Sequence, residues 1–155
     1  MQREQKKRPE QTYAPAAELP PVLLQHIGFV INKAAQRVRE SGEAALAPLR
    51  ISVRHFGVMA LVHECGPLSQ QTIGARLRCD RTTMVSVIDD LERLKFAKRV
   101  THPGDRRAYA INLTEKGKRA LTEAAGIISK VQSDFLAPLE AAERKQLNAL
   151  LQKVL

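Results

Sequence analysis

The chain has 155 residues, a length that suits one domain with a single core. Its 25 Lys and Arg against 16 Asp and Glu give a formal charge of +9, which favours a polyanionic partner, either nucleic acid or an acidic membrane face. No apolar run is long enough to span a membrane, the first ten residues lack the apolar segment of a signal peptide, and two cysteines cannot form a disulfide scaffold. We therefore expect a basic, cytoplasmic protein that binds duplex nucleic acid.

Residues 1–21 are predicted to form a flexible basic tail outside the fold, because they contain four of the eight prolines and few apolar residues. From Val22 onward the apolar residues recur every three or four positions through Val38. This spacing predicts one long helix over 22–46, which ends before Pro48.

Three further helices are expected in the next fifty residues. Ser52 is a candidate N-cap for a helix over 53–64, and Ser69 for a short helix over 70–77. After a tight turn at Arg78 and Cys79, Asp80 can cap a helix over 81–95. Its expected buried stripe consists of Met84, Val87, Ile88, Leu91 and Leu94. Two helices joined by a tight turn form a helix-turn-helix pattern.

A β-hairpin is predicted directly after this pattern, with strands over 97–101 and 108–113 and with Tyr109, Ile111 and Leu113 on one face. A hairpin in this place is a wing. Thr114 is then expected to cap a long helix through about residue 133. A last short helix carries the apolar stripe Leu147, Leu150, Leu151 and Val154. The expected fold is mainly α with a small β-hairpin wing, a winged helix-turn-helix plus a helical dimerisation region.

The basic residues gather around the wing. From residue 92 to residue 119, cations outnumber acids nine to three. Most charge runs are only a solvated face, but this one coincides with the wing and adjoins the helix pair, which favours DNA contact.

The shapes of the DNA grooves divide the candidate contacts into three groups. The start of a recognition helix meets base edges in the major groove, so the candidate base contacts are Arg81, Thr82, Thr83 and Ser86. Thr82 and Thr83 could instead cap the first helical turn. The wing turn, 102–107, carries Arg106 and Arg107, which suit a narrow minor groove. Candidate phosphate contacts are Ser69, Gln70, Gln71, Arg76 and Arg78.

Several runs resemble the MarR family of winged helix-turn-helix regulators, over about residues 22–155. The most specific is the wing, where the family's Asp-x-Arg signature falls on Asp105 and Arg107 and the Leu-Thr-x-x-Gly entry to the next helix falls on 113–117. The resemblance implies that Arg107 enters the minor groove and that Asp105 helps to hold the wing. It also implies an obligate homodimer on a palindromic operator, with dimerisation helices at 22–47 and 115–155 and a DNA-binding lobe at 52–113.

The resemblance further implies a small effector, often a phenolic or aromatic acid, bound between the dimerisation helices and the DNA-binding lobe. The candidate ligand residues there are His26, Arg54 and His55, for each of which a satisfied or exposed polar residue is the alternative. Arg54 or His55 could pair a ligand carboxylate. Basic residues on the first helix would suit the phosphates of a CoA thioester, although a solvated face explains them as well.

The chain departs from the redox-sensing members of the family. Organic-peroxide sensors carry a reactive cysteine early in the first helix, and residues 22–46 contain none. Cys65 and Cys79 are expected to be small buried hydrophobes. His63, Glu64 and Cys65 are consecutive, so they point in different directions on a helix, and we expect no metal site and no cofactor.

The expected function is that of a transcriptional repressor with no membrane partner, released from DNA by a small aromatic acid or its CoA thioester. The alternative is an architectural or RNA-binding basic protein without effector sensing, since size and charge alone fit one. The wing and the long flanking helices favour the regulator. An enzyme is the third possibility, but the sequence shows no glycine-rich phosphate loop and no triad spacing, and Asp89 and Asp90 are neighbours on different faces of a helix.

Overall fold

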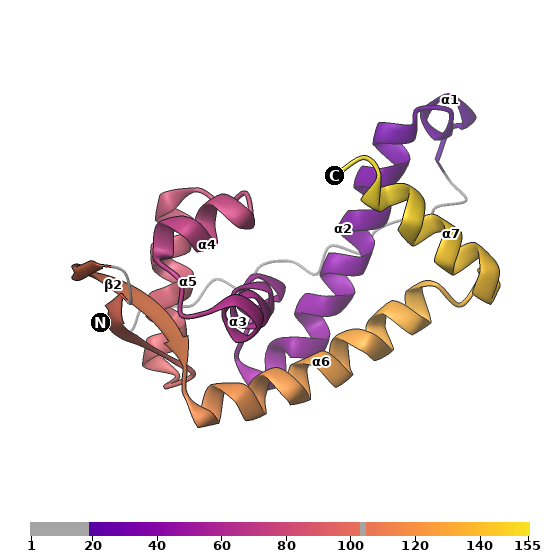
Figure 1. The fold of residues 1–155 in the computed structure, drawn as a ribbon. Coiled ribbons are helices and arrows are strands. Elements are labelled where there is room, and N and C mark those ends of the chain that lie inside the picture. Colours follow the sequence, from indigo (N-terminus) through magenta and orange to yellow (C-terminus); the bar gives the residue numbers. More distant parts are fainter. Residues whose placement is uncertain (1–18, 103–104) are drawn as a thin grey trace, which may run out of the picture. The chain divides into compact units, whose positions relative to one another are not determined.

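A computed structural model describes residues 19–102 and 105–155, and it leaves undescribed the side chains of 102 and 105–107. Most of the predicted tail, residues 1–18, therefore lies outside the described residues. The chain divides into two compact units between Gln36 and Arg37. Figure 1 shows the elements, which run in the order α1, α2, η2, α3, α4, α5, β1, β2, α6 and α7.

The first predicted helix is broken into two. Helix α1, Pro21–Leu24, is a single turn, and α2, Ile27–Leu46, begins after a gap of two residues. The prediction of one helix over 22–46 was wrong at this point. The His26 N–H bonds to the Leu23 carbonyl, three residues back, and so closes the turn, while the His26 carbonyl accepts the first bond of α2, from Val30. As predicted, α2 ends before Pro48, which lies in the short 3₁₀-helix η2, Ala47–Leu49.

Four side-chain caps set the helix starts of the second unit. Ser52, Ser69, Asp80 and Thr114 each accept the backbone N–H three residues further on. This confirms the four predicted caps. The helices they begin are α3 (Val53–Cys65), α4 (Gln70–Arg76), α5 (Arg81–Arg93) and α6 (Glu115–Phe135), and α7 (Ala141–Gln152) follows.

The predicted wing is present as an antiparallel pair of strands, β1 (Ala97–His102) and β2 (Asp105–Leu113). Pairing continues to His102 and Asp105, so both strands are longer than predicted and the expected six-residue turn over 102–107 was wrong. Ile111 also exchanges two backbone hydrogen bonds with Leu68, which fastens the hairpin to the start of the α4 segment. Tyr109 shares a face with Ile111 but is 69% exposed, because it lies beyond the end of the core.

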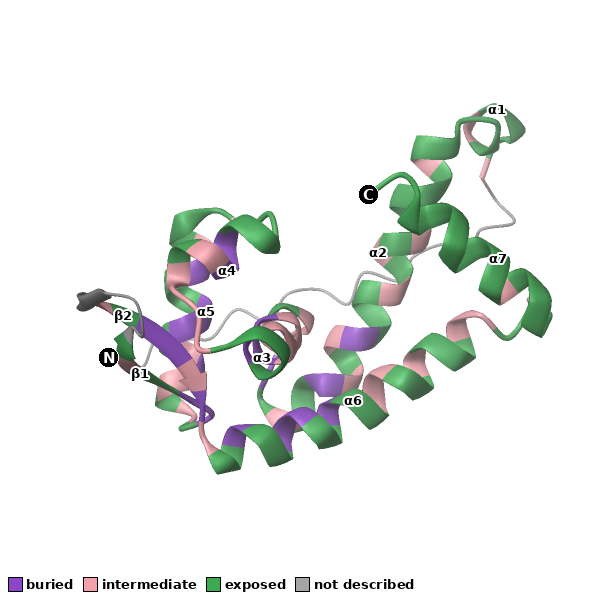
Figure 2. Ribbon diagram, in the orientation of Figure 1, coloured by how far each residue is buried: buried purple, intermediate pink, exposed green. Residues whose placement is uncertain are grey.

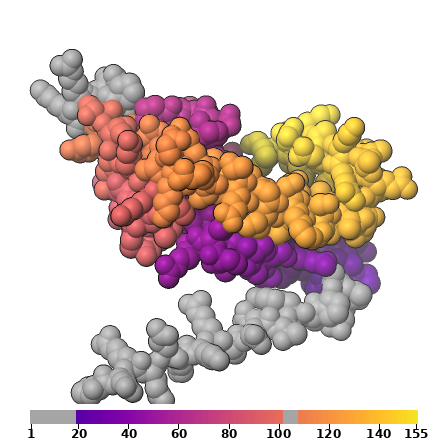
Figure 3. Space-filling model, turned by 90° about the horizontal axis from the view of Figure 1, so that it is seen from below, coloured from indigo at the N-terminus to yellow at the C-terminus, as the bar shows by residue number. Residues whose placement is uncertain are grey.

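The core lies between α3, α4, α5, the hairpin and the first half of α6 (Figure 2). Four of the five residues predicted for the buried stripe of α5 are buried, and Leu94 is only half-buried. On α6, Leu121 and Ala124 are buried, whereas Ile128 and Val131, further along, are half-buried. The apolar residues of α7 are exposed. Figure 3 shows that α6 in orange and α7 in yellow continue the surface of the second unit away from the hairpin.

The joint between the wing and α6 explains the Leu-Thr-x-x-Gly run. Thr114 Oγ1 accepts the Gly117 N–H at 3.0 Å and donates to the Lys95 carbonyl at 2.7 Å. Gly117 lies against the Phe96 backbone, so a Cβ at this position would collide with the Phe96 carbonyl. The run therefore allows the first turn of α6 to pack directly on the segment that follows α5.

The described residues bear on two predictions, the lack of a membrane-spanning run and the burial of the two cysteines. No single described helix is long and apolar enough to cross a membrane, although α2 with η2 and α3 together, bent by 77°, reach that length and composition. Helix α3 is a core helix, with Val58, Met59 and Val62 buried.

Cys79 is half-buried against the core, but Cys65 is exposed, so the predicted burial of Cys65 was wrong. Cys65 is the last residue of α3, where the helix has passed the core.

Candidate nucleic-acid interface

One face of α5 is packed on the core and the opposite face is open. The open face lines a shallow depression with Arg81, Thr82, Val85, Ser86, Asp89 and Asp90. Their spacing of one, three and four residues places them on one side of the helix. Arg81, Thr82 and Ser86 are exposed, as a base-reading surface requires.

Val85 belongs to this open face, and the sequence reasoning did not single it out. Its side chain is 38% exposed between polar neighbours. The signal was available, because Val85 lies four residues after Arg81 and falls outside the buried stripe of α5. An exposed apolar group at this place could contact a thymine methyl.

Thr83 has a different role from the other three candidate base contacts. Its N–H donates to Asp80 Oδ1 at 2.9 Å and its Oγ1 to Asp80 Oδ2 at 2.7 Å. The bond from the Thr83 hydroxyl is the main reason that the pKa of Asp80 is lowered. The Thr83 side chain is therefore engaged in the Asp80 cap of the first turn, the alternative weighed from the sequence, while Thr82 stays exposed beside Arg81.

The candidate phosphate contacts lie on α4 and on the turn that follows it. Ser69 is engaged in capping, with its Oγ 2.8 Å from Thr72 Oγ1, and Gln70 beside it is half-buried. Gln71, Arg76 and Arg78 are exposed. Arg78 has a left-handed backbone with φ 48° and donates from Nη2 to the Leu155 carbonyl at 3.3 Å.

Acidic and basic side chains pair along the second half of α5 and at its end. Asp90 Oδ1 lies 2.7 Å from Arg93 Nη2, and the bond from Arg93 is the main reason that the pKa of Asp90 is lowered. Asp89 is paired with Arg99 on β1. Part of the basic run therefore neutralises acids on α5, and only part of it can face a polyanion.

Two lysines at the start of α6 also have protein partners. Lys116 Nζ donates to the Leu94 carbonyl at 2.9 Å and lies 5.0 Å from the centre of the Phe96 ring. Lys118 pairs with Glu115, and this bond lowers the pKa of the Glu115 carboxyl. Lys116 thereby fastens the beginning of α6 to the end of α5.

The wing residues Asp105, Arg106 and Arg107 begin β2, and their side chains lie outside the described part of the structure. Their roles in holding the wing and in minor-groove contact remain predictions.

The three candidate ligand residues have different surroundings. His26 is exposed in the break between α1 and α2, and Arg54 is exposed in the first turn of α3. His55 points inward instead, with a side chain that is only 12% exposed. As neighbours on one helix, Arg54 and His55 face different directions.

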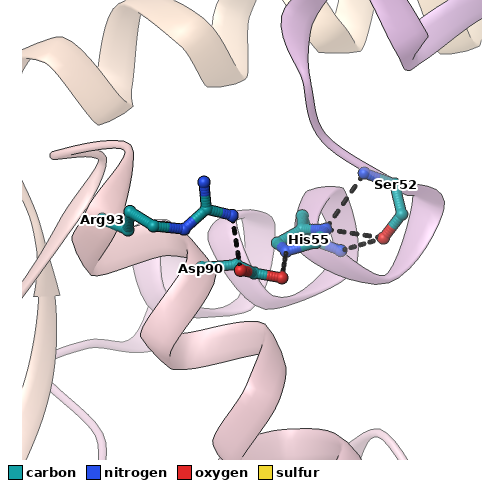
Figure 4. A network of polar contacts seen from close by, with 4 residues as sticks. All are labelled: Ser52, His55, Asp90 and Arg93. Atoms are coloured by element: carbon teal, nitrogen blue, oxygen red, sulfur yellow. Dashed lines mark hydrogen bonds and ion pairs between the residues drawn. The ribbon is translucent and has the colours of Figure 1, made fainter. Parts of the chain in front are cut away.

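His55 lies in a polar network that joins α3 to α5 (Figure 4). Its Nδ1 accepts the Ser52 backbone N–H at 3.0 Å and lies 2.6 Å from Ser52 Oγ. The backbone N–H of His55 donates to the same Ser52 oxygen at 3.2 Å. Its Nε2 lies 3.6 Å from Asp90 Oδ2. Burial lowers the pKa of His55 and outweighs the opposite effects of Asp90 and Glu43.

Comparisons with known proteins agree on one family. Residues 51–109 match the MarR family model. A protein of Thauera aromatica, described as a candidate transcriptional regulatory protein for the hcr operon, is 31% identical over 99 residues, which are 64% of this chain and 60% of that protein. The chain thus matches less than two thirds of that relative's length.

Solved structures of the family share the fold. The transcriptional repressor CouR bound to a 23-mer DNA duplex is 26% identical, with a TM-score of 0.80 over 88% of this chain and 98% of that one. CouR from Rhodococcus jostii RHA1 bound to p-coumaroyl-CoA is 26% identical, with a TM-score of 0.76 over 85% of this chain and 93% of that one. MarR from E. coli, at 22% identity, has a TM-score of 0.74 over 84% and 97%. Residues 51–109 thus carry a MarR-family domain, and the chain has the winged-helix fold of the family's solved structures.

Proposed function

We propose that this protein is a transcriptional regulator that binds duplex DNA as a homodimer and represses transcription. The observation that carries the proposal is the open face of α5. Its first two turns present Arg81, Thr82, Val85 and Ser86 to solvent, while the opposite face is fixed in the core. A helix held in this way can enter a major groove and read base edges.

The relatives support this function. CouR, which shares the fold at a TM-score of 0.80, is a transcriptional repressor bound to a DNA duplex. The Thauera aromatica protein is also described as a regulator of transcription. We assign base contacts to Arg81, Thr82 and Ser86, and add Val85. We assign the minor-groove contact to Arg107. We assign the phosphate contacts to Gln71, Arg76 and Arg78.

A homodimer would cover apolar side chains that each unit leaves in solvent. On α7, Leu147, Leu150 and Leu151 are 38%, 52% and 37% exposed. In the first unit, Val22 and Ile27 are 59% and 73% exposed. Apolar patches of this kind mark interfaces, and a second copy of the chain offers the same apolar stripes. Two lobes related by a two-fold axis would match a palindromic operator.

We propose an aromatic acid or its CoA thioester as the effector. CouR has been solved with p-coumaroyl-CoA, and PcaV from Streptomyces coelicolor, 26% identical to this chain, with its natural ligand. Arg54 is the best placed of the three candidates to meet an anionic group, because its guanidinium is exposed, whereas His55 is bound to Ser52. The proposal involves no cofactor and no catalytic step, and it places the protein in the cytoplasm.

The test is selection of a duplex from a random pool by the purified protein, followed by a gel shift. We expect an enriched sequence with two-fold symmetry, and a sedimentation coefficient that corresponds to a dimer at micromolar concentration. Competition with structured RNA of equal charge separates this function from that of a basic RNA-binding protein. Failure to enrich any duplex would contradict DNA reading. Release of the selected duplex by p-coumaroyl-CoA or free p-coumarate, but not by CoA alone, would support the effector class.

A further inference from the structure

His55 lies where three elements of the second unit meet. It is the third residue of α3 and follows the cap residue Ser52. Glu43, in the part of α2 that belongs to this unit, accepts the Val53 N–H at 3.2 Å and thereby joins α2 to the same turn. On the other side, α5 presents Asp90, which Arg93 holds at 2.7 Å. The charged groups around His55 are therefore Glu43, Asp90 and Arg93.

The hydrogen bonds determine which ring nitrogen carries the proton. The Ser52 amide can only donate, and it lies 3.0 Å from Nδ1, so Nδ1 is the unprotonated acceptor of the neutral ring. The proton is then on Nε2, which is buried without a hydrogen-bond partner among the described residues. Asp90 Oδ2, at 3.6 Å, is too far for a direct bond, so the attraction between the two groups is electrostatic.

We propose that His55, on α3, is a positioning residue that holds Asp90 of the recognition helix in place, and that protonation of His55 strengthens DNA binding by adding a positive charge beside Oδ2, the Asp90 oxygen that Arg93 does not bind. The proposal rests on the proposed function, because it concerns the DNA-facing side of α5. Asp90 lines the same depression as Arg81 and Thr82. A carboxylate at that place repels the phosphates that the helix must approach, and Arg93 offsets this repulsion from Oδ1 alone.

Protonation alters both contacts of the ring. A proton on Nδ1 ends its role as acceptor of the Ser52 N–H but lets it donate to Ser52 Oγ, 2.6 Å away. The new positive charge then faces Asp90 through Nε2. Burial lowers the pKa of His55 in the free protein, so that the neutral form dominates at neutral pH. Nearby phosphates favour the charged form, and by linkage DNA binding then takes up a proton.

The experiment compares the wild type with His55→Gln and His55→Leu on the duplex that the wild type selects at pH 7.5. A glutamine at this position keeps a capping acceptor and an amide donor but does not titrate. We expect His55→Leu to lose affinity at every pH and His55→Gln to recover most of that loss. From pH 8 to pH 5.5 the wild type should gain about three- to tenfold more affinity than His55→Gln.

The other three histidines occur in both proteins, so the comparison isolates His55. Equal dependence of affinity on pH in the wild type and in His55→Gln overturns the proposal and leaves DNA reading intact. A nitrogen NMR spectrum that places the proton of the neutral ring on Nδ1 overturns it as well, without any DNA present. If the wild type selects no duplex at any pH, the proposed function fails, and the role of His55 fails with it.

Discussion

The guanidinium of Arg99 on β1 holds Asp89 on α5, with Nη2 2.9 Å from Oδ1. The same group reaches Glu92 one turn later on that helix, with Nη1 2.8 Å from Oε2. One side chain thus ties the first wing strand to two carboxylates of the recognition helix. Its exposed fraction of 42% makes the contribution of these pairs to stability small. We expect their main effect to be on the direction of the hairpin relative to α5.

Replacing Arg99 tests this tie. Arg99→Ala should lower the free energy of unfolding by no more than about 1 kcal/mol. It should weaken binding to the selected duplex by a larger amount, because the wing and the recognition helix no longer approach DNA in a fixed relation. Urea titration and fluorescence anisotropy measure the two quantities. Lys98→Ala, at the next position of the same strand, removes an equal charge, and an equal loss of affinity in both variants would show that Arg99 acts by charge alone.

The contact between Gly117 and Phe96 predicts a large effect from one methyl group. Gly117→Ala should lower the free energy of unfolding by about 2 kcal/mol or more, because the added Cβ meets the Phe96 carbonyl. Gly126→Ala, in the same helix with open space around it, should raise it by about 0.5–1 kcal/mol. Chemical denaturation of both variants checks the contrast. Similar effects of the two substitutions would contradict close packing at Gly117.

Arg81 and Arg78 should separate base reading from phosphate binding. Arg81→Ala should reduce affinity for the selected duplex more than for a mixed-sequence duplex, because base contacts carry specificity. Arg78→Ala should reduce both alike and flatten the plot of log Kd against log salt concentration by about one unit of slope. Gel shifts at several salt concentrations measure both. If Arg81→Ala also weakens the two duplexes equally, Arg81 contacts phosphate.

Acid should destabilise the free wild-type protein through His55. Its pKa is lowered in the folded state from the ordinary value of 6.5, so below that pH the unfolded chain binds more protons than the folded one. The stability that the neutral ring supplies is fully present at higher pH and is lost as the pH falls through 6.5 towards the folded-state pKa. The Tm of the wild type should therefore fall more than that of His55→Gln between pH 7.5 and pH 5. Scanning calorimetry at constant ionic strength measures this, and parallel curves would contradict it.

Local signals in the sequence predicted much of the fold. The caps at Ser52, Ser69, Asp80 and Thr114 depend on residues three positions apart, and all four were confirmed. The break after α1 was missed because the apolar spacing continues across it, while the change in hydrogen bonding at His26 leaves no mark in that pattern. The exposure of Tyr109 depends on where the core ends, which strand alternation does not reveal.

The candidate site was predictable to a similar degree. The exposed residues of α5 follow from its buried stripe, so Arg81, Thr82 and Ser86 were found and Val85 could have been. The ion pairs were not predictable, because Arg99 meets Asp89 only after the hairpin has folded back on α5. The contact of His55 with Asp90 has the same origin, since they are 35 positions apart in sequence with helix α4 between them.

The contacts of Thr114 and Gly117 couple the orientation of α6 to that of α5. Lys116 bonds to the Leu94 carbonyl and Thr114 to that of Lys95, so the first turn of α6 is fastened to the residues that directly follow α5. Helix α6 has 21 residues, a length of about 30 Å. A displacement of about 3 Å at its far end corresponds to a tilt of about 5° at this joint. Because Leu121 and Ala124 of α6 are buried in the core, a tilt of α6 would reach α5 both through this joint and through the core.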